Sequence, residues 1–222
     1  MKWKTNTKFR NNSSEEEQQQ SEMVGKILPY LLADSTETQQ QTSCGIRVVD
    51  NKIFFYGDID QQSCLELNRL LMEVDIKNQN LKNTLSDHAY TPIIHLHMNT
   101  HGGCIYSAFS TVDTIRTLKS SVHTYVDGLV ASAGTLISSV GHKRIMGKYA
   151  QMLVHQLSSE TYGTYMQMQN DMDNCENLMK ILKQFYKTHT KIPMKRLDEL
   201  MKADIYLDAT ECLTYSLIDQ II

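Results

Sequence analysis

Everything else in this 222-residue chain is best interpreted from one segment, Gly128-Leu129-Val130-Ala131-Ser132-Ala133-Gly134. Residues 122–126 before it alternate and are rich in β-branched side chains, which predicts a strand. The apolar residues 135–140 after it predict a short buried helix. Ser132 would therefore lie where a strand turns into a helix, a place where N–H groups lack helical partners and the dipole favours negative charge.

Two interpretations of this segment are open. An acyl-transfer enzyme needs a hydroxyl presented at a tight turn, with the next residue's N–H free to hold an oxyanion. Alanine, serine and glycine also gather wherever a helix packs closely on a sheet. For the segment alone, helix packing is the simpler interpretation, so the choice depends on partner residues elsewhere in the chain.

Composition limits the classes of protein to consider. The length suits one domain with a short appendage, and 41% hydrophobic residues are enough for a core. A net charge of −3 gives no reason to expect nucleic acid or an anionic membrane as partner. The five cysteines are odd in number and lack a Cys-x-x-Cys motif, which favours reduced thiols. With no signal segment or membrane span in the sequence, we expect a cytoplasmic protein.

The N-terminal part differs in composition from the rest. Residues 1–22 are rich in Asn, Ser, Glu and Gln, which is typical of a flexible segment. Residues 23–32 fit a short amphipathic helix, and the residues that follow, up to 43, are polar again. We therefore expect residues 1–44 to form a polar extension and residues 45–222 to form the globular domain.

Within that domain, strand and helix patterns alternate. Strands are predicted at 46–49, 53–56, 92–98, 122–126, 144–146 and 151–154. Helices are predicted around 64–74, 108–118 and 135–140, then at 161–188, from 193 and from 209, with a surface loop at 77–91. This order predicts an α/β fold with a mostly parallel sheet and flanking helices. The helix at 161–188 is too long for so small a domain to bury, so it should project as an arm or form an assembly surface.

Two residues later in the chain, His155 and Asp204, favour the enzymatic interpretation of Ser132. Ser132, His155 and Asp204 each follow a predicted element, in an order that suits nucleophile, general base and orienting carboxylate. Val130 excludes the Gly-x-Ser-x-Gly elbow. Asp208 and Asp219 are nearby rivals for the carboxylate.

Other candidate residues have simpler explanations. His95 and His97 would share one face of a strand, but no carboxylate or cysteine has a matching spacing, so we expect no metal site. Cys104 is better explained as a small residue at a helix start than as a nucleophile. The methionines of the long helix suit packing and imply no cofactor.

Four motifs occur together in this chain and in one order. They are Asn99-x-x-Gly102-Gly103, Gly128-x-x-Ala131-Ser132, Leu153-Val154-His155-Gln156 and Asp204-Ile205-Tyr206-Leu207-x-x-x-Glu211-x-x-x-Tyr215-x-Leu217-Ile218-Asp219. Any one would be weak evidence, but together they are specific. Over residues 45–222 the chain resembles the ClpP family, the proteolytic subunits of Clp proteases.

The resemblance implies a serine peptidase with the ClpP/crotonase fold. It implies that Ser132, His155 and Asp204 form the triad, and that backbone N–H groups of Gly102 and Ala133 form the oxyanion hole. Family members form heptameric rings, usually stacked in pairs through the long helix, the handle. A hexameric AAA+ unfoldase supplies unfolded protein to the enclosed chamber, and without it only small peptides are expected to enter.

The chain also departs from the family pattern. Thr100-His101 replaces Ser-Pro, and Ala133 replaces a Met, at positions that act mainly through the backbone. Leu157-Ser158-Ser159 replaces Pro-x-Gly-Gly, and Ala203 replaces an Arg, where the family pairs its rings. The alternatives to a peptidase are a catalytically silent ring subunit, for which a complete triad has no use, and a crotonase-type acyl-CoA enzyme, which would not need Ser132 and His155.

Overall fold

The computed structural model describes residues 45–85 and 91–222, and the predicted extension at 1–44 with its short helix lies outside the described residues. The strands are β1 (Ile46–Val49), β2 (Lys52–Tyr56), β3 (Ile93–Thr100), β4 (Ser121–Ala131), β5 (Lys143–Met146), β6 (Gln151–Leu153), β7 (Tyr206–Leu207) and β8 (Gln220–Ile221). The helices are α2 (Gln61–Leu85), α3 (Ile105–Thr117), α4 (Ala133–Ser139), α5 (Tyr165–His189), α6 (Met194–Leu200) and α7 (Ala209–Thr214).

The strands form one sheet in the order β1-β2-β3-β4-β5-β8, and β6 joins β4 to β7. The β1–β2 and β6–β7 pairs are antiparallel, and every other pair is parallel. The predicted α/β fold with a mostly parallel sheet is therefore confirmed. Parallel strands need crossover connections, and α2, α3 and α4 supply them.

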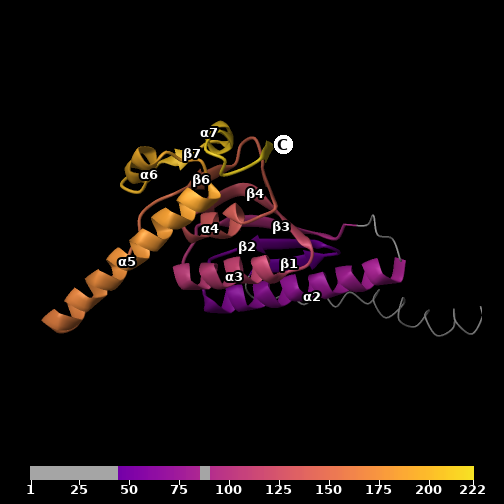
Figure 1. Cartoon of the computed structure of the whole chain (residues 1–222), viewed down its shortest axis with the longest axis horizontal. Coiled ribbons are helices and arrows are strands. Elements are labelled where there is room, and N and C mark those ends of the chain that lie inside the picture. Colours follow the sequence, from indigo (N-terminus) through magenta and orange to yellow (C-terminus); the bar gives the residue numbers. More distant parts are fainter. Residues whose placement is uncertain (1–44, 86–90) are drawn as a thin grey trace, which may run out of the picture. The chain divides into compact units, whose positions relative to one another are not determined.

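Side chains alternate between the two faces of the sheet. In β3, Ile94, Leu96 and Met98 are fully buried on the face that packs toward α2 and α3, which lie side by side in Figure 1. His95 and His97 share the opposite face, as predicted from the period of two. Their Nδ1 atoms lie 2.8 Å from the hydroxyl of Tyr125 and from Oδ2 of Asp127, respectively. Among the described residues, no group of three or more His, Cys, Asp or Glu could hold a metal ion.

The prediction of a loop at 77–91 is wrong for residues 77–85, because α2 continues to Leu85. The polar end of this helix is held by polar contacts rather than by an apolar stripe. Asp75 accepts a hydrogen bond from the backbone N–H of Ser120 at 2.7 Å, and the buried amide of Asn78 lies 3.4 Å from the Ser120 hydroxyl. Hydrophobic periodicity does not register such contacts. Residues 86–90 lie outside the described residues.

Strand β4 is longer than predicted. It runs through Gly128 to Ala131, because its first half pairs with β5 and its last residues pair with β6. The serine of the central segment therefore follows the strand directly, and α4 begins at the next residue, Ala133.

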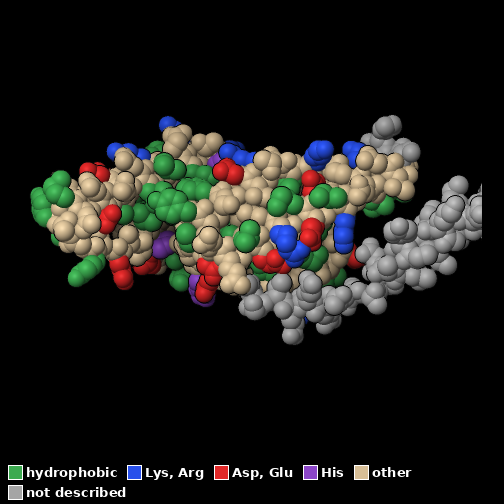
Figure 2. Space-filling model, turned by 90° about the horizontal axis from the view of Figure 1, so that it is seen from below, with side chains coloured by type: hydrophobic (Ala, Val, Ile, Leu, Met, Phe, Trp, Pro, Cys, Tyr) green, Lys and Arg blue, Asp and Glu red, His purple; other side chains and the backbone are tan. Residues whose placement is uncertain are grey.

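The long helix is confirmed with slightly different limits. Helix α5 begins after a capping box, in which Thr164 and Gln167 each bond the other's backbone N–H, and Leu178, Leu182 and Tyr186 are its buried residues. All residues of its first half, 165–174, are exposed. Figure 1 shows α5 running away from the sheet, and Figure 2 shows hydrophobic side chains at the end where it begins. The helix predicted from 193 is α6, which begins at Met194 with Pro193 as its N-cap residue.

Candidate active site

Ser132 occupies a strained turn between β4 and α4. Its φ of 54° lies in the left-handed region, which side chains rarely adopt. Its N–H donates to the carbonyl of Leu153 at 2.8 Å, and its own carbonyl accepts from both the N–H and the hydroxyl of Thr135, at 3.0 and 2.6 Å. Strain of this kind persists where surrounding contacts over-determine the backbone, and it concentrates at functional sites.

The turn after β3 approaches Ser132 very closely. A Cβ added to Gly102 would lie 2.5 Å from Cβ of Ser132 and 2.8 Å from the carbonyl of Ala131. Gly102 also has a φ of 101°. Only a residue without a side chain fits there, so the glycine brings the end of β3 against the turn at Ser132.

The two glycines direct their N–H groups differently. The N–H of Gly102 donates to the hydroxyl of Thr100 at 3.0 Å. A parallel bridge joins Ile59 and Gly103 through the N–H groups of Ile59 and Cys104. In such a bridge the N–H of Gly103 itself points away from Ile59, and Gly103 lines the same cavity as Ser132. The geometry therefore favours Gly103 over the predicted Gly102 as an oxyanion donor, because the N–H of Gly102 is already bonded to the hydroxyl of Thr100.

His155 follows β6 and is held by its neighbours. The N–H of Gln156 donates to the carbonyl of Met201 at 3.0 Å, which fixes the chain just after the histidine. Nδ1 of His155 lies 3.6 Å from Oδ1 of Asp204, beyond a hydrogen bond but within reach of an ion pair. The His155 side chain is 24% exposed and that of Asp204 is 82% exposed.

The two rival aspartates have other partners. Asp208 caps α7 by accepting the N–H of Glu211 at 2.8 Å. Asp219 pairs with the guanidinium of Arg144, whose Nε lies 2.9 Å from Oδ2 of the carboxylate. This bond to Arg144 lowers the pKa of Asp219 below its usual range. Asp204 is therefore the predicted carboxylate that the fold brings to His155.

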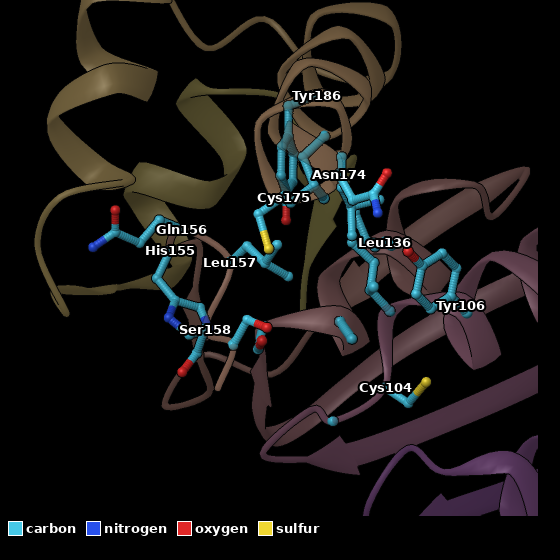
Figure 3. A pocket seen from close by; sticks show the side chains of 17 residues that line it. Cys104, Tyr106, Leu136, His155, Gln156, Leu157, Ser158, Asn174, Cys175 and Tyr186 are labelled. Carbon is cyan, nitrogen blue, oxygen red and sulfur yellow. The ribbon is translucent and has the colours of Figure 1, made fainter. Parts of the chain in front are cut away.

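A cavity of about 310 Å³ lies beside Ser132 and His155. Its wall includes Gly103 and Ala133 and the apolar side chains of Leu136, Leu157, Leu178 and Leu182. Figure 3 shows His155, Gln156 and Leu157 on one side, Cys104 and Tyr106 across from them, and Asn174, Cys175 and Tyr186 from α5. The site can thus take an apolar group next to a hydroxyl and an imidazole.

Further residues of the site follow from the fold. Cys104 begins α3, as expected, and its side chain lines the cavity; hydrogen bonding to Ser107 lowers its thiol pKa. Thr135 and Tyr186 were not predicted. The spacing of Thr135 from Ser132 is a pattern known for hydroxyl-to-carbonyl bonds and could have suggested it. No sequence signal links Tyr186 to a turn 51 residues earlier along the chain.

The fold and the site define a class: an α/β protein whose cavity lies at the carboxyl ends of parallel strands, beside a serine at a strained strand–helix turn. The sequence matches the family Clp protease over residues 37–222. The chain therefore belongs to the Clp protease family, as a divergent member with the ClpP fold.

Individual relatives agree with this assignment. The ATP-dependent Clp protease proteolytic subunit of Deinococcus radiodurans is 24% identical over 202 residues, covering 90% of this chain and 94% of the relative. The subunit of the same name from Streptococcus mutans is 36% identical over 137 residues, covering 59% of this chain and 69% of the relative. A solved structure of a ClpP1 mutant from Listeria monocytogenes has a TM-score of 0.66 at 18% identity and covers 78% of this chain and 91% of that one.

The helices are too short or too polar to span a bilayer in the part of the chain that the structure describes, residues 45–85 and 91–222.

Proposed function

We propose that this chain is a serine endopeptidase subunit of a Clp-type compartmentalised protease. In this proposal Oγ of Ser132 attacks the scissile carbonyl while His155 takes its proton. The imidazolium then protonates the leaving amine, and water attacks the acyl-enzyme with His155 again as the base. Asp204 orients the imidazole and stabilises its charged form. The chemistry calls for no cofactor.

One observation carries this proposal: Ser132, at a strained turn, and His155, paired with Asp204, border the same cavity. The names of the curated relatives, which are proteolytic subunits, agree with a peptidase. For the oxyanion hole we propose the N–H groups of Ala133 and Gly103, with Gly103 replacing the predicted Gly102.

The proposed assembly is a homo-oligomer, namely the heptameric ring that the family resemblance implies, with stacking into pairs through α5. The exposed first half of α5 supports an assembly role, because Tyr165, Met166 and Met172 leave apolar surface open there. The proposed substrate is peptide or unfolded protein, delivered by an AAA+ unfoldase. The free cysteines among the described residues fit the cytoplasm, where we place the protein.

A silent ring subunit is the second candidate, and one observation favours it. The 3.6 Å between His155 and Asp204 exceeds a hydrogen bond, and Asp204 is largely exposed. Catalytic hydrogen bonds are often long in unliganded enzymes and tighten with substrate, so this distance also suits an active triad. Experiment can separate the two candidates.

Reaction with a fluorophosphonate probe, followed by mass mapping of the labelled peptide, tests the proposal. We expect labelling at Ser132, and its loss in His155→Ala, because triad residues act as a unit. Asp204→Asn should slow labelling by roughly 10²–10⁴-fold. Asp208→Asn is the matched control and should label at the wild-type rate. Folded, assembled protein that does not label, with or without a candidate unfoldase, would contradict the proposal and leave the silent subunit.

A further inference from the structure

A chain of buried hydroxyl groups leads from α5 to the backbone at Ser132. The hydroxyls of Tyr186 and Thr135 lie 2.5 Å apart, and the Thr135 hydroxyl donates to the carbonyl of Ser132 at 2.6 Å. Thr135 is 0% exposed and Tyr186 is 2% exposed. Each hydroxyl has a partner, so the network carries no unsatisfied donor in a place where one would be costly.

The direction of each bond follows from the groups present. A carbonyl only accepts, so the proton of the Thr135 hydroxyl is directed to Ser132. The oxygen of Thr135 then accepts from the hydroxyl of Tyr186. Burial raises the pKa of Tyr186 to about 12, so this phenol keeps its proton throughout the neutral range.

The carbonyl held in this way belongs to the same peptide group as a proposed oxyanion donor. The C=O of Ser132 and the N–H of Ala133 share one planar trans unit, in which they point in opposite directions. A carbonyl fixed toward Thr135 therefore fixes the N–H of Ala133 on the opposite side. Such fixed donors stabilise a developing oxyanion because they need no reorganisation during the reaction.

We propose that Thr135 and Tyr186 are positioning residues that set the direction of the Ala133 N–H in the oxyanion hole. The inference rests on the proposed peptidase function and deepens it. Tyr186 comes from α5, the helix whose Leu178 and Leu182 also line the cavity. A shift of α5 would thus move the N–H of Ala133 through two hydrogen bonds. The geometry of the site therefore depends on the position of α5.

The test compares steady-state hydrolysis of a fluorogenic peptide amide by the full-length wild type and by hydroxyl-deletion variants. A donor that acts on the transition state alters kcat, whereas a general loosening of the cavity alters KM. We expect Thr135→Val to lower kcat roughly 10–100-fold with little change in KM. This loss is smaller than the roughly 10²–10³-fold expected for a deleted oxyanion donor, because the N–H of Thr135 still bonds the carbonyl of Ser132. Tyr186→Phe should lower kcat by several-fold. Thr135→Ser keeps the hydroxyl and should therefore retain most of the wild-type kcat.

Thr124 in β4 provides a matched control, because its hydroxyl also bonds a carbonyl of α4. The hydroxyl of Thr124 is equally buried and donates to the carbonyl of Ser138, near the other end of α4, at 2.8 Å. Thr124→Val deletes the same kind of bond without touching the Ser132–Ala133 peptide. It should therefore leave kcat unchanged, even if it lowers the free energy of unfolding.

The outcomes are distinct. A wild type that neither hydrolyses peptide nor labels with fluorophosphonate overturns the proposed function and this inference together. If the wild type is active, two results overturn the inference alone: an unchanged kcat in Thr135→Val, or an equal fall of kcat in Thr135→Val and Thr124→Val. If Thr135→Val does not fold, Tyr186→Phe decides: an unchanged kcat overturns the inference, and a lower kcat at constant KM supports it.

Discussion

Ser132 has its side chain at a backbone position that suits glycine better. Its φ of 54° costs a residue with a Cβ about 1–2 kcal/mol. The contacts of its N–H with Leu153 and of its carbonyl with Thr135 hold it there. The strain is consistent with a position kept for the hydroxyl that it presents rather than for stability.

This strain predicts a difference in stability between two variants that lack the Ser132 hydroxyl. Ser132→Ala and Ser132→Gly should both lose peptide hydrolysis while leaving assembly intact, because each removes the hydroxyl. Ser132→Gly should be more stable than Ser132→Ala by about 1 kcal/mol, since relief of the positive φ exceeds the entropy lost by a glycine on folding. Chemical denaturation measures the difference. Equal stability of the two variants would show that the turn is not strained.

The last strand of the sheet depends on one guanidinium group. Arg144 in β5 bonds the carboxylate of Asp219, just before β8, and the carbonyls of His189 and Ser216. It therefore joins the ends of α5 and of the C-terminal segment to the sheet. The same contact occupies the carboxylate of Asp219, which the sequence alone left as a rival to Asp204 for pairing with His155.

This contact predicts a pH-dependent stability. Because bonding to Arg144 lowers the pKa of Asp219, its stabilising contribution is present above the unfolded aspartate pKa of about 3.9 and is lost as pH falls through the lower folded value. Wild type should thus exceed Asp219→Asn in stability at pH 7, and the gap should close below about pH 4. Denaturation at several pH values measures it, and a gap that is constant with pH would contradict the assignment.

Sequence patterns predicted the elements better than their limits. The apolar periodicity of α3 and α5 predicted both helices, because their buried faces repeat every three to four residues. The end of α2 was missed because Asp75 and Asn78 anchor it through polar contacts with Ser120, more than 40 residues away. The length of β4 was missed because its end is paired by β6, a partner that no local pattern reveals.

The described part of the chain leaves an apolar surface uncovered along the first half of α5. Tyr165, Met166 and Met172 are exposed there, although side chains of this kind are usually buried. An isolated subunit has no evident use for such a surface. It is consistent with contacts between copies of the chain, which the proposed rings require.

If these side chains mediate assembly, charge should disrupt it. Tyr165→Glu combined with Met172→Glu should reduce the oligomer mass measured by sedimentation, because charges desolvated in an interface are costly. Leu65→Glu is a matched control, since Leu65 is an exposed apolar residue on α2. It should assemble as the wild type does. An unchanged mass for the α5 variant would place the contacts between copies elsewhere.

The sequence by itself determined the α/β class, the order of the elements and the candidate residues Ser132, His155 and Asp204, because each depends on local periodicity or on motifs read along the chain. The approach of Asp204 to His155, the bridge between Ile59 and Gly103 and the link from Tyr186 to the turn at Ser132 needed the folded structure. They are contacts between segments distant in sequence, and such contacts exist only once the sheet has brought the strand ends together.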